Sequence, residues 1–238
     1  MSSPEWHVAI LIPARNEELL IRRCLNSVLD ACSLLPRSVT TDIVVVCDSS
    51  TDLTFEIAEY MLAGPGIVIA TDAAIVGHAR ALAARVALER FSGPLSRCWF
   101  ANTDADCSVP KTWLTDQLAI AEQGIEAIAG VVSVDSFEEH SAGTDMRFRH
   151  NYVIHADGSH PHVHGANIGV RADTYLRLGG WRGLETAEDH DLWNRLVTTA
   201  SKRQSTARIQ VVTSGRRIGR APHGFAEALA VHDEVAPC

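Results

Sequence analysis

Long hydrophobic runs are absent from this sequence. Its longest apolar stretches are the size of single strands, well short of the ~20 residues that a membrane-spanning helix needs. Residues 1–5 lack the basic start of a signal peptide. We therefore expect a cytoplasmic protein that has no transmembrane segment.

Paired cysteines and basic runs are absent as well. The six cysteines include no Cys-x-x-Cys pair, and several lie in predicted strands or helices as small apolar residues. This distribution favours reduced thiols over a disulfide framework or a zinc site. The net charge is -8 and no long basic run occurs, which argues against nucleic acid as a partner.

Two common nucleotide-binding signatures are missing from the end of the first predicted strand. The sequence there reads Pro13-Ala14-Arg15-Asn16-Glu17. A nicotinamide dehydrogenase would have G-x-G-x-x-G at this point, and a sugar-phosphate nucleotidyltransferase would have a glycine-rich basic loop. Both enzyme classes are therefore disfavoured.

What the chain does contain is a regular alternation of short apolar runs and helical patterns. Its 238 residues and 46% hydrophobic content fit one globular domain. The predicted strands are residues 8–12, 43–47, 67–70, 99–101, 127–134 and 208–213. The predicted helices are residues 17–31, a helix that is capped by residues 50–52 and runs to about 62, residues 77–90, a helix that begins near Pro110, and residues 172–178, 189–200 and 225–231. Such alternation predicts an α/β fold in which helices cover both faces of a mostly parallel sheet.

Acidic side chains follow the ends of several predicted strands. Asp104 and Asp106 come after the strand at residues 99–101, and Asp48 follows the strand at residues 43–47. Ligands of parallel sheets bind at the carboxyl ends of strands, so these groups are expected to share one crevice. Carboxylate oxygens suit a hard divalent ion such as Mg²⁺ or Mn²⁺ that is shared with nucleotide phosphates. For an isolated Asp-x-Asp pair, a solvated loop is the alternative interpretation.

Six motifs occur in a fixed order along the chain. They are Val8-Ala9-Ile10-Leu11-Ile12-Pro13-Ala14-Arg15-Asn16-Glu17, Asp48-Ser49-Ser50-Thr51-Asp52, Asp104-Ala105-Asp106, Gly165-Ala166-Asn167, Gly179-Gly180-Trp181 and Glu188-Asp189. In this order and approximate spacing they resemble the family 2 glycosyltransferases of the GT-A fold, over about residues 8–220. The resemblance implies a single domain with a Rossmann-like, mostly parallel sheet. Its nucleotide-binding half would be about residues 8–134, followed by a less regular acceptor-binding half at about 135–220 and a tail at 221–238.

The resemblance also implies a nucleotide-diphosphate sugar donor, a divalent metal ion (Mn²⁺ or Mg²⁺) and an acceptor that offers a hydroxyl. The residues that match donor-binding positions of the family are Pro13, Ala14, Arg15, Glu17, Asp48, Arg80 and Asp104. Arg80 departs from the residue that is commonest in the family at its position. For Glu17, a carboxylate at a helix start is a second interpretation that can coexist with donor binding.

Metal and base positions follow from the two acidic motifs. By resemblance, Asp106 is the direct metal ligand, Asp104 lies nearer the ribose, and a histidine near the C-terminus, here His223, completes the metal shell. Glu188 and Asp189 match the acidic pair in which the second carboxylate takes the proton from the acceptor hydroxyl. An acidic first turn of a helix is the alternative interpretation of that pair.

The acceptor side is expected to include Gly165, Ala166, Asn167 and Trp181. Small residues would let the backbone approach the sugar, and Asn167 could bond a sugar hydroxyl. Trp181 fits a sugar-stacking residue and a core aromatic equally well.

Two loops carry unusual side chains. His155, His160, His162 and His164 crowd one segment, where an acceptor loop is favoured over a transition-metal site because no cysteine or carboxylate completes a known ligand spacing. The basic segment at residues 214–220 fits either a loop that closes over the diphosphate or a solvated loop.

The sequence therefore predicts a metal-dependent glycosyltransferase that acts by single displacement, inverts the anomeric centre and makes one transfer. Membrane helices and the Gln-x-x-Arg-Trp motif of processive members are absent. A retaining transferase and an inactive nucleotide-sugar-binding or scaffold protein are the alternatives. The donor base, the sugar and the acceptor (a small molecule, a glycan or a lipid-linked acceptor) are left open, as is a homodimer.

Overall fold

The structure is a computed structural model that describes residues 6–220 and 224–233. The strands are β1 (His7–Ala14), β2 (Thr40–Asp48), β3 (Gly66–Thr71), β4 (Cys98–Asn102), β5 (Ala127–Val134), β6 (Ile168–Arg171) and β7 (Arg203–Thr213). The α-helices are α1 (Ile21–Ser33), α2 (Thr54–Met61), α3 (Val76–Arg90), α4 (Trp113–Ala121), α5 (Thr144–Asn151), α6 (Ala172–Arg177), α7 (Glu188–Thr198) and α8 (Phe225–Ala230). Short 3-10 turns occupy Leu95–Arg97, Gly165–Asn167 and Val231–Asp233.

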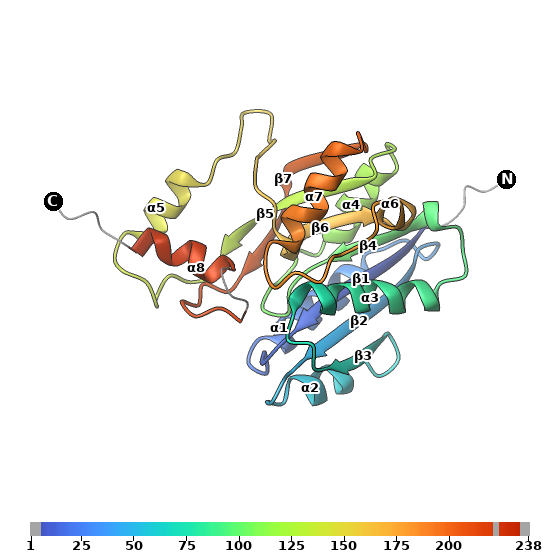
Figure 1. Ribbon diagram of the computed structural model, residues 1–238, viewed down its shortest axis with the longest axis horizontal. Coiled ribbons are helices and arrows are strands. Elements are labelled where there is room, and N and C mark those ends of the chain that lie inside the picture. Colours follow the sequence, from blue (N-terminus) through green and yellow to red (C-terminus); the bar gives the residue numbers. More distant parts are fainter. Residues whose placement is uncertain (1–5, 221–223, 234–238) are drawn as a thin grey trace.

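In the described residues, the strands form one seven-stranded sheet with the order β3-β2-β1-β4-β6-β5-β7 (Figure 1). β6 runs antiparallel to its neighbours β4 and β5, and the other strand pairs are parallel. This confirms the mostly parallel sheet predicted from the sequence. Because the parallel strands run in one direction, their carboxyl ends meet at the same edge of the sheet.

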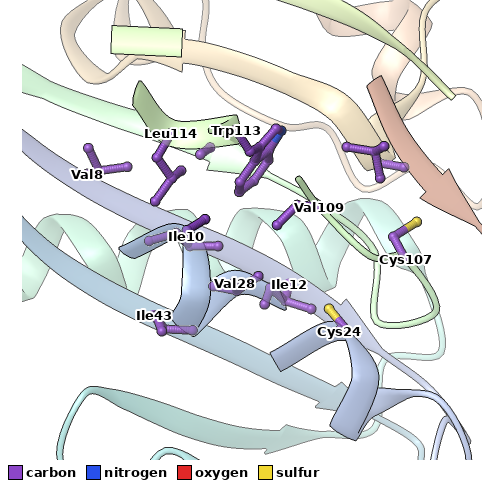
Figure 2. Packing of buried hydrophobic residues seen from close by; sticks show 14 of the residues in the cluster. Val8, Ile10, Ile12, Cys24, Val28, Ile43, Cys107, Val109, Trp113 and Leu114 are labelled. Carbon is purple, nitrogen blue, oxygen red and sulfur yellow. The ribbon is translucent and has the colours of Figure 1, made fainter. Parts of the chain in front are cut away.

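Helices cover both faces of the sheet because its central strands are apolar on both faces. In β1, Val8, Ile10 and Ile12 belong to one buried cluster together with side chains of α1, α2 and α4 (Figure 2). The alternating residues Ala9 and Leu11 belong to a second cluster, built with α3, α6 and α7. The period of two along a strand thus divides one apolar run between two cores.

α1 begins later than predicted, and the delay moves polar groups into a loop at the sheet edge, whereas α2 follows its predicted cap at residues 50–52. α1 begins at Ile21 instead of residue 17, because Asn16 has a left-handed φ of 52° and residues 17–20 form a turn. α2 begins at Thr54, whose backbone N–H donates to Asp52 Oδ1 at 3.0 Å. These turns place the Glu17 side chain at the sheet edge, outside a helix.

The chain beyond β7 returns to pack against α5, so that α5 and α8 lie side by side at one end of the molecule (Figure 1). Phe148 of α5 contacts Phe225 of α8, with ring centroids 6.1 Å apart. His140 Nδ1 lies 3.1 Å from both carboxylate oxygens of Asp233, and its Nε2 lies 2.8 Å from the Gly215 carbonyl oxygen. His140 therefore ties the loop after β7 to the C-terminal turn. None of the helices in the described ranges is both long and apolar enough to span a bilayer.

Asn167 lies in the core, which corrects the prediction that its amide faces the acceptor. The residue is 1% exposed, and its Oδ1 accepts a hydrogen bond from Trp113 Nε1 at 3.0 Å. Its Nδ2 donates to the backbone oxygens of Val131 and Ile209 at 2.9 and 3.0 Å. A side chain on Gly130 would collide with this amide, so the glycine makes room for the network. The amide joins β5, β7 and α4 instead of a substrate.

Replacing Asn167 with Ala should lower the free energy of unfolding by about 3 kcal/mol, because a buried indole N–H and two backbone carbonyls lose their partner. Urea denaturation followed by circular dichroism measures this change. Asn26→Ala is the matched control, since Asn26 is exposed on α1, and it should change the free energy by less than about 0.5 kcal/mol. Equal values for the two variants would contradict the structural role of Asn167.

Candidate functional site

A cleft with a volume of about 380 Å³ opens at the sheet edge where β1, β2 and β4 end. Many of the residues predicted from the sequence line it: Pro13, Ala14, Arg15, Glu17, Asp48, Arg80, Asp104, Asp106, Gly165, Ala166, Glu188 and Asp189. Asn167 and Trp181 are not among the lining residues, and His223 lies outside the described residues. The fold thus gathers the motifs of both halves around one cavity.

Asp104 and Asp106 follow β4 and form the acidic floor of the cleft. Their carboxylate oxygens and Cys107 Sγ all lie within 4.8 Å of one another. Burial raises the pKa of the Cys107 thiol well above its usual range, so this sulfur stays protonated. The two carboxylates are the donors that hard divalent cations prefer, and they fit Mn²⁺ or Mg²⁺ better than a soft metal ion.

Arg80 of α3 joins the two acidic motifs. Its guanidinium is 2% exposed, and it donates to Asp104 Oδ1 at 2.6 Å and to Glu188 Oε1 at 2.9 Å. Burial raises the pKa of the Asp104 carboxyl, and the Arg80 charge opposes this rise. Arg80 lines the cleft as predicted, and two of its guanidinium nitrogens are already used to hold Asp104 and Glu188.

Arg216, in the loop after β7, occupies the opposite side of the acidic floor. Its side chain is 14% exposed, and its Nη2 donates to Glu17 Oε1 at 2.7 Å and to Asp106 Oδ2. Burial raises the pKa of the Glu17 carboxyl to about 7, and Arg216 acts against that rise. Arg217 and Arg220 are 57% and 47% exposed. Arg216 is thus the most buried arginine of the predicted basic loop; Arg220 also lines the cleft, with its Nε 3.8 Å from Glu17 Oε1, and Arg217 is largely in contact with solvent.

The residues predicted to bind the nucleotide differ in whether their side chains already have partners within the protein. Asp48 accepts hydrogen bonds from the backbone N–H groups of Ala74 and Ile75 at 2.8 and 2.9 Å, so it orders the loop before α3. Ala74 has a left-handed φ of 54°, which turns the backbone toward that carboxylate. Arg15 lines the cleft and has no ion-pair partner among the described residues. It is therefore the arginine of this side whose charge is not neutralised.

Asp189 is held at the start of α7 by two backbone groups. Gly165 N–H donates to its Oδ2 at 2.8 Å, and His190 N–H donates to its Oδ1 at 2.7 Å. Asp191, in the same turn, points elsewhere and pairs with Arg182 and Arg195. The turn is therefore an acidic helix start that also directs one carboxylate into the cleft.

Trp181 belongs to the core, and the sugar-stacking interpretation is corrected. It is 5% exposed within the cluster under α3, α6 and α7, and Arg80 Cζ lies 5.5 Å from its ring centroid. Gly165 is needed for the same arrangement, because a side chain at this position would collide with the Arg80 guanidinium. The glycine therefore serves the close approach of Arg80 as well as the opening of the cleft.

The histidine segment is ordered by separate contacts. The rings of His160, His162 and His164 stack in sequence with centroids 5.9 and 6.1 Å apart, as expected for alternating residues on one side. Each Nε2 has its own partner: the carbonyl oxygens of Ala129 and Val153 for the first two, and the Tyr152 hydroxyl for His164. No metal-ligand group includes these histidines in the described ranges.

Sequence reasoning missed three contributions to the cleft. The sequence identified Arg216 only as part of a basic loop. Its position in the cleft depends on contacts with residues more than 100 positions earlier, which no local pattern indicates. Phe225 and Ala226 of α8 line the cleft from a helix whose sequence carries no motif. The hydroxyl of Tyr152 is hydrogen-bonded to Nε2 of His164, which lines the cleft.

Solved structures with this architecture support the fold. TarS 1–349 from S. aureus in complex with UDP-GlcNAc has 17% identity and a TM-score of 0.62, over 90% of this chain and 60% of that chain. Mannosyltransferase PcManGT from Pyrobaculum calidifontis, in complex with GDP-Man and Mn²⁺, has 19% identity and a TM-score of 0.64, over 96% and 69%. GalNAc-T7 with UDP, GalNAc and Mn²⁺ has 15% identity and a TM-score of 0.66, over 91% and 45%. The chain thus spans about 60% of TarS 1–349.

No protein with a curated description matches the chain. The sequence profile described as "Glycosyl transferase family 2" matches residues 9–177, which is more than half of the chain. That match includes the strand-end motifs of β1, β2 and β4 and the turn before β6. The chain therefore belongs to glycosyl transferase family 2, and its sheet has the GT-A fold.

Proposed function

We propose that this protein transfers a sugar from a nucleoside-diphosphate sugar to an acceptor hydroxyl, in a single metal-dependent displacement that inverts the anomeric centre. One observation carries this proposal: Arg80 bonds Asp104 and Glu188 at the same time. This bridge brings the acidic floor after β4 next to the acidic turn of α7. This contact supports a donor site and a proton acceptor in the same cleft.

On the donor side, the free charge of Arg15 and the inward charge of Arg216 suit a diphosphate. Asp104 and Asp106 would hold Mn²⁺ or Mg²⁺. Such a cation, when bound, would neutralise the negative charge that develops on the leaving diphosphate. The UDP-GlcNAc in TarS and the GDP-Man and Mn²⁺ in PcManGT support this class of ligand.

On the acceptor side, Asp189 is the general base. Two backbone N–H groups fix its carboxylate, so its orientation is set before the acceptor arrives. Its remaining lone pairs can accept the proton of an acceptor hydroxyl that attacks the anomeric carbon. Glu188 supports this turn through Arg80 and does not itself take the proton.

Donor and metal binding can be tested by thermal shift with UDP, GDP, ADP and dTDP, each with and without Mn²⁺. One nucleotide at 100 times its Kd should add about 2.7 kcal/mol, which raises Tm by roughly 5–10 °C. Asp106→Asn should remove the Mn²⁺-dependent part of this rise. Asp145→Asn, which changes an exposed acid on α5, should keep it. An unchanged Tm with every nucleotide would refute the proposed donor site.

Asp189→Asn should lower the rate of sugar transfer by about 10³-fold, because the general base is lost. The Kd of the nucleotide sugar, measured by calorimetry, should change by less than about twofold. Asp191→Asn is the control, since that carboxylate pairs with Arg182 and Arg195 outside the cleft. Transfer at the wild-type rate by Asp189→Asn would remove this residue from the mechanism, and proton NMR of the anomeric centre of the wild-type product decides inversion.

Arg216→Gln should tighten Mn²⁺ binding in the absence of nucleotide by about tenfold, because a cation no longer shares the Asp106 carboxylate with a guanidinium. Titration of Mn²⁺ followed by electron paramagnetic resonance measures this affinity. Arg22→Gln removes the same charge from an exposed position on α1 and controls for long-range electrostatics. Weaker Mn²⁺ binding by Arg216→Gln would mean that Arg216 does not compete for this carboxylate.

A further inference from the structure

His164 lines the cleft and precedes Gly165, one of the two residues whose backbone N–H groups hold Asp189; the other, His190, also lines the cleft. The ring of His164 lines the cavity, and the next residue, Gly165, donates its N–H to Asp189 Oδ2 at 2.8 Å. Phe225 of α8 packs edge-on against the imidazole, with centroids 5.7 Å apart. The ring is thus confined beside the carboxylate that we assign as the base.

The hydrogen-bond chain behind His164 favours one position for the proton of its ring. Val132 N–H donates to Tyr152 Oη at 3.0 Å, and that oxygen lies 2.8 Å from His164 Nε2. A backbone N–H only donates, so the phenol oxygen accepts at that contact. Its own hydrogen then points to His164 Nε2, the single acceptor that it contacts within the described ranges. This arrangement gives the phenol hydrogen an acceptor when Nε2 carries no hydrogen, and we infer that the neutral imidazole carries its hydrogen on Nδ1.

The environment keeps this imidazole neutral. Burial lowers the pKa of His164 to about 4, and the nearby Asp189 charge opposes this effect only in part. His162 stacks on the Tyr152 ring at a centroid distance of 3.8 Å, which holds the phenol in place. The Nδ1 atom of His164 has no hydrogen-bond partner in the part of the chain that the structure describes. His164 thus lines the same cleft as Asp189, whose charge acts on its ring.

We propose that His164 positions the acceptor by donating its Nδ1–H to a hydroxyl oxygen next to the reacting hydroxyl, whose proton goes to Asp189. This inference rests on the proposed function and names the acceptor class. The N–H donor of His164 and the carboxylate of Asp189 would each bind one of two neighbouring hydroxyl groups. The sugar acceptor is therefore a carbohydrate with a vicinal diol. His164 contributes orientation, because an imidazole with a pKa of about 4 is already neutral near pH 7 and does not change its charge there.

Two substitutions separate the two ring nitrogens. In His164→Asn the side-chain amide nitrogen replaces Nδ1, whereas in His164→Gln the amide reaches the position of Nε2 and leaves no donor at Nδ1. With methyl glycosides of glucose, galactose and mannose as acceptors, His164→Gln should raise the acceptor KM by about 10- to 30-fold. His164→Asn should stay within about threefold of wild type. The Kd of the nucleotide donor should be the same in both variants.

His155→Gln is the control on the same segment, because His155 is exposed and should leave KM unchanged. With monodeoxy glycosides that lack the neighbouring hydroxyl, wild type and His164→Gln should have the same acceptor KM. The inference is overturned if His164→Gln keeps the wild-type KM. It is also overturned if no glycoside with a vicinal diol releases nucleotide faster than the hydrolysis of the nucleotide sugar by water. Absence of nucleotide-sugar binding in the wild type would instead refute the proposed function on which the inference rests.

The tautomer can be tested without any substrate. Long-range proton–nitrogen NMR correlations of protein labelled at histidine nitrogens should show His164 as the neutral Nδ1–H form from pH 5.5 to pH 8, with His164→Gln providing the assignment. Tyr152→Phe should convert this signal to a mixture of tautomers. An Nε2–H form in the wild type, or protonation of His164 near pH 6.5, would overturn the assignment of Nδ1 as the donor.

Discussion

The buried guanidinium of Arg80 is the interaction on which the cleft depends. Its Cζ lies 5.5 Å from the Trp181 ring centroid, and it donates to carboxylates from two distant segments, Asp104 and Glu188. Burying a charge is favourable only when its partners are also in place, and removing one partner of such a pair costs about 3–5 kcal/mol. Gly165 leaves the space that the guanidinium needs. One carboxylate of each acidic motif is therefore held by the same cation.

A second arginine balances the remaining acids. Arg216 reaches Glu17 and Asp106 from the loop after β7, and His140 holds that loop through the Gly215 carbonyl. Carboxylates gathered at one sheet edge repel each other, so the protein places two cations between them. The same crowding makes the floor attractive to a divalent ion, which would compete with Arg216 for Asp106.

The resemblance in sequence predicted which residues line the cleft better than it predicted what their side chains do. Asp104, Asp106 and Asp189 line the cavity, as their motifs indicated. Asn167 and Trp181 lie in the core. Their motifs did not predict this, because a motif indicates the type of residue at a position and not the direction of its side chain. Both residues stabilise the framework under the cleft: the first through an amide network and the second through Arg80.

By itself the sequence determined the alternation of strands and helices, the mostly parallel sheet and the strand ends at which acids stand, because these follow from local periodicity and chain order. Only the tertiary structure decided which charge neutralises which. The pairs of Arg80 with Glu188 and of Arg216 with Asp106 join residues 108 and 110 positions apart. The proton on His164 likewise depends on a phenol and a backbone N–H from other segments. Local sequence carries no record of such contacts, since they form only when packing brings distant elements together.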